Sequence, residues 1–145
     1  MAEITAICIS KKRGTVKNPI PQGTIITNFG LENDAHAGDW HRQISLLPIE
    51  AVEKFSQEYN LQLTPGVFGE NLLIRGIDLK QLPIGTKLQC TNGILLEITQ
   101  IGKKCHSGCE IQELTGKCIM PHEGVFAKVL HGGIIKANDN INIIS

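Results

Sequence analysis

Residues 87–100 read KLQCTNGILLEITQ, and this stretch decides the fold class. Two apolar-rich runs, Lys87 to Thr91 and Ile94 to Gln100, flank the pair Asn92-Gly93. Asn-Gly is the strongest short hairpin signal, because both residues tolerate a positive φ angle. The stretch therefore predicts an antiparallel β-hairpin.

The rest of the chain has the same character. It contains 21 Ile, 14 Leu and 5 Val, and β-branched side chains favour strands. Fifteen Gly and six Pro divide it into short segments. Further strands are expected at residues 4–9, 24–29, 43–47, 71–74, 126–130 and 140–144. One amphipathic helix is expected to begin at Pro48, as a first-turn residue, and to end near Asn60. About eight strands and one clear helix predict a mostly-β fold, a closed or partly closed barrel of mainly antiparallel strands with a few short helices.

Length and charge limit the classes of function. With 145 residues and no internal repeat, the chain is expected to form a single domain over residues 1–145. Fourteen Lys plus Arg balance fourteen Asp plus Glu, which argues against general nucleic-acid binding. No apolar run reaches the roughly 18 residues of a membrane span, and the N-terminus does not resemble a signal peptide. We therefore expect a cytoplasmic location, where five Cys more often serve as thiols or metal ligands than as disulfides.

The first candidate site segment is residues 30–41, GLENDAHAGDWH. Two Asp, two His and the only Trp of the chain fall within it, and loops on a rigid scaffold often carry function. A structural interpretation also stands, in which Asp34 and Asp39 cap turns and the His side chains are exposed.

The second candidate is residues 64–76, TPGVFGENLLIRG. Glycines let backbone N–H groups approach an anion closely, although a purely structural turn explains the segment as well.

The third candidate is residues 103–118, KKCHSGCEIQELTGKC. The positive charges of Lys103 and Lys104 favour the thiolate form of Cys105, which is the nucleophilic and metal-binding form. Cys8 and Cys90 lie inside apolar strand patterns instead, and we expect both in the core.

The chain carries, in this order, GLENDAHAG, RQISLLPIE, LTPGVFGENLLIRGIDL, IGTKLQ, LLEITQIGKKC and GVFAKVLHGG. This ordered set resembles the MOSC domain, the molybdenum cofactor sulfurase C-terminal domain. The resemblance runs from about residue 4 to residue 144 and is strongest to small free-standing bacterial members. It implies a β-barrel-like fold, binding of the molybdenum cofactor or a related pterin-bound metal–sulfur centre, and handling of sulfur.

The resemblance also assigns residues. The family's motif cysteine falls at Cys105, the expected catalytic residue, which would carry persulfide sulfur or contact molybdenum. The pattern Gly-Leu-x-Gly-Asp-x-His falls on residues 30–36, with Asn33 in place of the second Gly. Asn is the next-best residue for positive φ, so the turn can survive. The expected cofactor-binding residues are Asp34, His36, His41, Arg42, Phe68, Gly69, Glu70, Asn71, Lys103, Lys104 and Cys109.

Three hypotheses remain open. In the first, the chain binds the molybdenum cofactor (molybdopterin) or transfers sulfur through Cys105. Its partner would be a sulfur donor, a molybdoenzyme or a cofactor-biosynthesis protein, and no pyridoxal phosphate is expected on this chain. In the second, it is a non-catalytic carrier of the cofactor. In the third, Cys105, Cys109, Cys118 and either His106 or His122 form a structural zinc site. We expect no stand-alone reductase activity, because relatives that reduce N-hydroxylated compounds carry additional redox domains.

Overall fold

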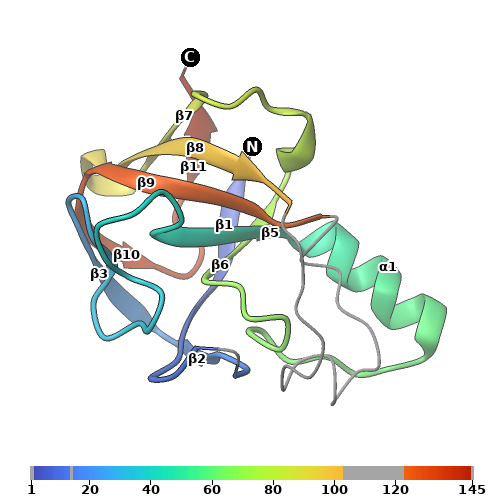
Figure 1. Cartoon of the computed structure of the whole chain (residues 1–145). Helices are drawn as coiled ribbons and strands as arrows, with labels where there is room; N and C mark the ends of the chain where they lie inside the picture. Colours follow the sequence, from blue (N-terminus) through green and yellow to red (C-terminus); the bar gives the residue numbers. More distant parts are fainter. Residues whose placement is uncertain (1, 14, 103–122, 145) are drawn as a thin grey trace.

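The computed structural model describes residues 2–13, 15–102 and 123–144, and in these ranges the chain forms two β-sheets and one α-helix (Figure 1). The larger sheet has eight strands in the order β11-β7-β8-β9-β5-β6-β1-β2, and the smaller has the order β10-β3-β4. The strands of the larger sheet are β1 (Glu3–Ile9), β2 (Asn18–Ile20), β5 (Ile44–Pro48), β6 (Leu72–Arg75), β7 (Lys87–Cys90), β8 (Leu95–Ile101), β9 (Val125–His131) and β11 (Ile141–Ile143). Those of the smaller sheet are β3 (Gln22–Ile26), β4 (Gly30–Leu31) and β10 (Gly133–Lys136). The helix is α1 (Ile49–Tyr59), and two 3-10 turns, η1 (Leu79–Gln81) and η2 (Thr91–Gly93), complete the elements.

The predicted hairpin is confirmed. β7 and β8 pair antiparallel, with Leu88 opposite Leu96. The turn between them has φ of 68° at Asn92 and 77° at Gly93, both in the left-handed region. Asn-Gly therefore supplies the backbone geometry that the sequence pattern predicts.

The expectation of a closed barrel is wrong, because neither sheet closes on itself. β11 lies at one edge of the larger sheet and β2 at the other. The start of β1, beside that edge, meets the entry to β11 at a bridge between Glu3 and Asn140. Backbone hydrogen bonds accompany the bridge, from the Ile4 N–H to the Asp139 carbonyl at 2.8 Å and from the Ile141 N–H to the Ala2 carbonyl at 3.2 Å. β2 occupies the outer edge of β1 along Ile7 to Ile9, so only the first part of β1 is free to meet the end of the chain. The mostly-β fold itself is confirmed.

The helix forms the crossover between β5 and β6, which pair in parallel. Pro48 is the last residue of β5 and the N-cap of α1. It was expected inside the first turn, so the helix begins one residue later than predicted. Asn60 ends the helix as expected, in a left-handed conformation with φ of 52°. No helix within the described ranges is long and apolar enough to cross a membrane.

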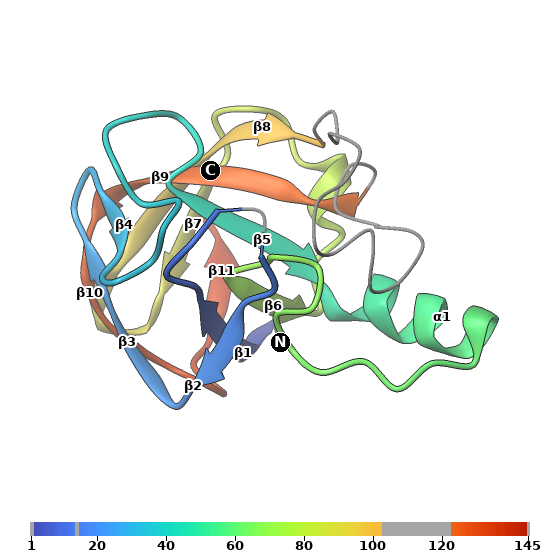
Figure 2. The same ribbon diagram turned by 60° about the horizontal axis from the view of Figure 1, so that its bottom comes forward.

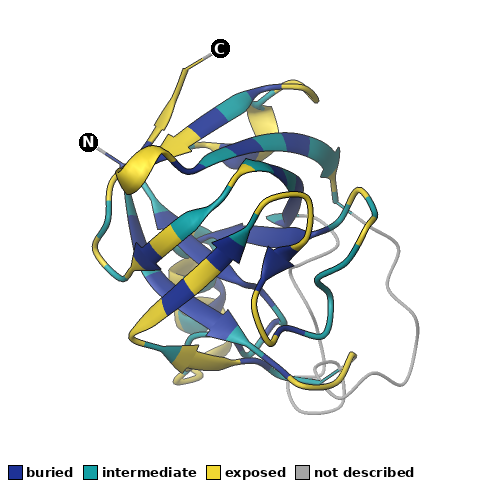
Figure 3. Cartoon of the chain, turned by 90° about the vertical axis from the view of Figure 1, so that its left-hand side faces the viewer, coloured by how far each residue is buried: buried dark blue, intermediate teal, exposed yellow. Residues whose placement is uncertain are grey.

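Two apolar clusters form the core. Buried residues alternate with exposed ones along β3, whereas β5 is buried at every position (Figure 3). Ile4 and Ile7 of β1 belong to the larger cluster. Ala6 and Cys8 of the same strand belong to the smaller cluster, together with Phe55 of α1. A register shift between Ile4 and Ala6 puts Ile4 and Ile7 on the same side of the strand. Cys8 and Cys90 are both buried, as predicted.

Three strands escaped the sequence analysis. No strand was expected at β2, at β4, which has only two residues, or at β10, which begins at Gly133. β10 pairs with β3, a strand distant in sequence, with Ile134 opposite Thr24. β2 and β4 each pair with the strand that directly precedes them in the chain. Strand formation at such positions depends on the neighbouring strand more than on local propensity.

Candidate functional site

Lys17 joins two of the predicted site segments, although no sequence pattern points to it. Its ammonium is buried and lies 2.7 Å from Oδ1 of Asp34, and both side chains have no exposed surface. The same ammonium lies 3.1 Å from Oγ of Ser10 and 3.0 Å from Nδ1 of His36. The three N–H donors of a protonated lysine thus have three acceptors.

The segment 30–42 folds around this lysine. Asp34 accepts backbone N–H bonds from Ser10 at 3.1 Å and from His36 at 3.2 Å. Asn33 has φ of 68°, so it replaces the expected glycine in the turn, as predicted. The buried carboxylate fixes the loop from inside and keeps His36 at its half-buried rim.

The segment 64–71 lies on the other side of Lys17, and Figure 2 shows the blue segment before β2 between the cyan and green loops. The backbone N–H of Lys17 donates to the carbonyl of Gly66 at 2.8 Å. A Cβ at Gly66, whose φ is 92°, would lie 2.1 Å from the Lys17 carbonyl oxygen. Only glycine allows this approach. The two motif segments are therefore brought together by one residue.

Glu70 and Asn71 organise this second loop from within. The carboxylate of Glu70 accepts the backbone N–H of Gly66 at 2.8 Å and that of Phe68 at 3.1 Å. The Asn71 amide donates to the Cys8 carbonyl at 3.0 Å, and its oxygen accepts the Ser45 N–H at 2.9 Å. Asn71 thereby connects β1, β5 and β6.

Phe68 and Gly69 are the first two residues of the Phe-Gly-Glu-Asn segment. The Phe68 ring is buried edge-on against Phe55 of α1, with ring centroids 5.2 Å apart. Gly69 has φ of 81°, the left-handed geometry that glycine adopts without strain. These two residues hold the loop against the helix.

Burial dominates the electrostatics of this region. Burial raises the pKa of Glu70 to about 7, against the opposing effect of its backbone N–H donors. Burial lowers the pKa of Lys17, while the Asp34 carboxylate acts in the opposite direction. Burial raises the pKa of Cys8 to about 12, with Glu70 adding to the shift. Cys8 is thus a core thiol and not a nucleophile.

A second group, the arginine–tryptophan cluster, consists of Arg13, Trp40, Arg42 and Phe126. The guanidinium carbons of Arg42 and Arg13 lie 4.5 Å and 4.9 Å from the centroid of the Trp40 ring. Arg42 also lies 5.5 Å from the Phe126 ring. The Nε of Arg42 is buried and has no hydrogen-bond partner anywhere in the described structure.

His41 lies beside this cluster, with its ring edge-on to Trp40 at 5.8 Å. Its Nε2 is 2.8 Å from Oε1 of Gln100 on β8, and its backbone carbonyl accepts a bond from the Thr99 hydroxyl. The Trp40 indole donates to the His36 carbonyl at 2.7 Å. The cluster is therefore connected through one loop to the Lys17 network.

The predicted site residues divide into three groups. Asp34, His36, Glu70 and Asn71 lie in or next to the Lys17 network, and His41 and Arg42 lie in or beside the arginine–tryptophan cluster. A third group lies outside the described residues: Lys103, Lys104, Cys105, His106, Cys109, Cys118 and His122. In the ranges that are described, no three His, Cys, Asp or Glu residues are placed to hold a metal ion.

Sequence reasoning missed Lys17, and it missed the contact between Arg13 and Trp40. Lys17 lies in a loop with three other basic residues within seven positions, and nothing local marks it as the buried one. Arg13 could have been connected to Trp40 only by knowing that the two loops meet. The burial of Lys17 and the contact of Arg13 with Trp40 are both set by the tertiary structure.

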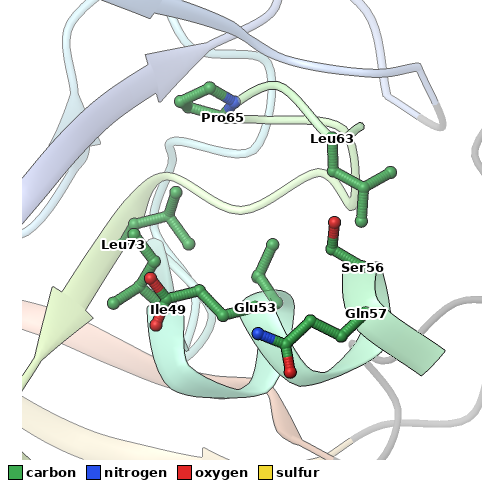
Figure 4. Close-up of a pocket in the computed structure, with 8 residues that line it drawn as sticks. Ile49, Glu53, Ser56, Gln57, Leu63, Pro65 and Leu73 are labelled. Carbon is green, nitrogen blue, oxygen red and sulfur yellow. The ribbon is translucent and has the colours of Figure 1, made fainter. Parts of the chain in front are cut away.

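A groove of about 260 Å³ lies between α1 and the segment that follows it (Figure 4). It is lined by Ile49, Val52, Glu53, Ser56, Gln57, Leu63, Pro65 and Leu73. None of the predicted site residues lines it, so the candidate site lies elsewhere.

Solved structures share this fold. YuaD from Bacillus subtilis superposes with a TM-score of 0.79 at 18% identity, covering 97% of this chain and 94% of that one. YiiM from Geobacillus stearothermophilus gives 0.78 at 18% identity, covering 100% and 76%. YiiM from Escherichia coli gives 0.69 at 18% identity, covering 99% and 70%. A search of curated proteins finds no match.

Structural likeness at 18% identity shows the fold alone, whereas a match to a family model shows the family. The model of the MOSC domain matches residues 33–142, which contain Asp34, His36, Glu70 and Asn71 of the two joined loops. Domains of this family are associated in general with molybdenum-cofactor binding or sulfur transfer. The match covers most of the chain, and the protein therefore belongs to the MOSC domain family.

Proposed function

We propose that this protein binds the molybdenum cofactor and carries sulfur on Cys105 in molybdenum-cofactor metabolism. The observation that most supports the proposal is the meeting of the two motif loops at Lys17. Asp34 accepts from the Lys17 ammonium, and Gly66 accepts from the Lys17 backbone. Two segments far apart in the sequence, each resembling a motif of the family, thus lie next to each other, which supports the proposal.

The buried members of this site act as positioning residues. Asp34 and Glu70 are 7% and 1% exposed, and backbone N–H groups occupy their carboxylates. Such internal bonding fixes the loops, because hydrogen bonds are strengthened in a buried setting of low dielectric constant. The surface of the loops, with His36, His41 and Arg42, is then presented in one arrangement.

Among the described residues, one group has the chemistry to hold part of the cofactor. A pterin cofactor carries a phosphate and a flat ring, and the arginine–tryptophan cluster offers a buried Arg42 Nε without an acceptor beside an indole ring. When bound, the cofactor supplies a molybdenum–sulfur centre to the site. Arg42 would hold its anionic end, and Cys105 is assigned as the thiol that handles sulfur.

Sulfur loading on Cys105 needs a persulfide-bearing partner. The Cys105 thiolate attacks the outer sulfur of the donor persulfide, a new S–S bond forms, and the donor thiolate leaves. The step transfers one sulfur atom with no net oxidation or reduction. Lys103 and Lys104 favour the attacking thiolate by their charge.

Mass spectrometry of the native full-length protein tests the proposal. After incubation with cysteine persulfide, we expect a mass increase of one sulfur atom in the wild type and none at this position in Cys105→Ser. Cys118→Ser is the matched control and should load as the wild type does. Equal loading of Cys105→Ser would overturn the role of Cys105. Retained cofactor without sulfur loading would identify a carrier, and one tightly bound zinc per chain would identify a structural metal site.

A further inference from the structure

The hydrogen bonds around Lys17 fix which of its neighbours donate and which accept. The hydroxyl of Ser10 donates to the Lys12 carbonyl at 2.9 Å, so toward Nζ of Lys17, 3.1 Å away, it acts as an acceptor. The Asp34 carboxylate, 2.7 Å from the same Nζ, is an acceptor as well. Two N–H bonds of Lys17 are thereby used, and the remaining position on Nζ faces Nδ1 of His36 at 3.0 Å.

The charge of Lys17 decides the direction of its hydrogen bond with His36. A neutral amine would turn its lone pair to Nδ1 and require a proton there, whereas an ammonium turns a third N–H to an unprotonated Nδ1. Burial lowers the pKa of Lys17, while Asp34 raises it, with smaller contributions in the raising direction from Cys8 and Glu70. A neutral Lys17 would leave the Asp34 carboxylate, which has no exposed surface, without a counter-charge, and an unpaired buried charge is strongly destabilising. The ammonium form therefore fits the site, with Nδ1 of His36 as its third acceptor.

We propose that Lys17 is a positioning residue that holds His36 as the neutral tautomer with its proton on Nε2. A neutral imidazole has one ring proton, so a donor at Nδ1 leaves that proton on Nε2. Two further bonds fix the backbone of His36. Its N–H donates to Oδ2 of Asp34 at 3.2 Å, and its carbonyl accepts the Trp40 indole N–H at 2.7 Å. Both the place and the protonation of His36 are thus set from inside the protein.

The tautomer determines what His36 can do. An Nε2 that carries a proton has no lone pair to offer, so it neither takes a proton from a substrate nor binds a metal ion. It donates a hydrogen bond, so the group that His36 contacts through Nε2 is an acceptor, such as a carbonyl oxygen or an anionic oxygen or sulfur atom. A second proton, on Nδ1, would place another cation 3.0 Å from the Lys17 ammonium. Within the proposed function, on which this role rests, His36 is a hydrogen-bond donor and not a general base.

Nitrogen NMR of the isotope-labelled, full-length protein observes the tautomer directly. At about pH 8, above the ordinary histidine pKa of about 6.5, we expect an unprotonated Nδ1 and a protonated Nε2 in the long-range proton–nitrogen spectrum of His36. The Nζ signal of Lys17 should be that of an ammonium whose protons exchange slowly, because it is buried. The variant His36→Gln identifies the His36 signals by their loss. A proton on Nδ1 of His36, or an amine signal from Lys17, overturns the proposal.

Variants test whether Lys17 is the cause. In Lys17→Met the donor to Nδ1 is gone, so the His36 proton should be shared between both ring nitrogens, and their shifts should move toward those of the exposed His131. The double variant Lys17→Met with Asp34→Asn removes the uncompensated charge as well and should show the same change if the single variant does not fold. Arg75→Gln, at an exposed arginine, is the matched control and should leave the His36 signals unchanged. Shifts of His36 that are the same in the wild type and in the folded Lys17 variant overturn the role of Lys17.

These spectra require neither a cofactor nor a sulfur donor, so the two proposals fail separately. A protein that does not load sulfur on Cys105 but shows the Nε2 tautomer of His36 refutes the proposed function and leaves the role of Lys17 standing. Sulfur loading together with a proton on Nδ1 of His36 overturns the role of Lys17 alone.

Discussion

Replacement of Lys17 by methionine tests whether the buried ion pair holds the two motif loops together. The substitution removes an ammonium 2.7 Å from the Asp34 carboxylate and leaves that carboxylate with no exposed surface and no counter-charge. Breaking a buried pair in this way costs about 3–5 kcal/mol of the free energy of unfolding. Asp34 still accepts the backbone N–H groups of Ser10 and His36, so we expect the lower end, about 3 kcal/mol.

Urea unfolding followed by circular dichroism measures this loss, with the free energy taken from the midpoint and slope. Addition of Asp34→Asn to Lys17→Met should recover part of it, because the uncompensated charge disappears. The control pair is Arg75 and Glu53, whose side chains are 43% and 49% exposed. Removing Arg75 should cost little, because solvent screens an exposed ion pair. A Lys17→Met protein no less stable than the Arg75 variant would refute the reasoning.

Three more predictions concern the same region. Burial raises the pKa of Glu70 from 4.5 to about 7, so between these pH values the folded protein holds a proton that the unfolded chain releases. The wild type should therefore lose up to about 3 kcal/mol of its free energy of unfolding as the pH rises from 4.5 to 7. Glu70→Gln should lack that slope in urea unfolding at each pH, and an unchanged slope would contradict the assignment. Gly66→Ala should cost about 2 kcal/mol more than Gly85→Ala in thermal unfolding, because both glycines have positive φ but only the first would place its Cβ 2.1 Å from a backbone oxygen. Cys8 and Cys90, in a variant whose other three cysteines are alanine, should react with a thiol reagent only after unfolding, because burial raises the pKa of each thiol to about 12; rapid reaction of the folded protein would argue against their burial.

The local features of the fold could be predicted from the sequence. Asn92-Gly93 fixed the hairpin, Asn60 ended the helix, and the apolar surroundings of Cys8 and Cys90 placed both in the core. Each of these depends on the residue itself or on its chain neighbours. Strand ends shifted by one to three residues, because a strand extends only as far as its partner does.

The candidate site was predictable only in its parts. Asp34 and Glu70 were chosen from their motifs, but the sequence did not show that both are buried and bonded to backbone N–H groups. Arg42 was predicted as a cofactor-binding residue, and the structure showed the Trp40 and Phe126 rings beside it. The roles of Cys105 and its neighbours stay predictions, because those residues lie outside the described ranges.

By itself, the sequence determined a mostly-β chain with one helix, one reliable hairpin and two glycine-rich loops of family character. Turn chemistry and hydrophobic periodicity act over a few residues and can be recognised along the chain. Only the tertiary structure decided that the larger sheet stays open, that Lys17 is the buried member of a basic loop, and that it joins the two motif loops. These outcomes depend on pairings between residues far apart in sequence, where one partner strand or one buried counter-charge outweighs local preference.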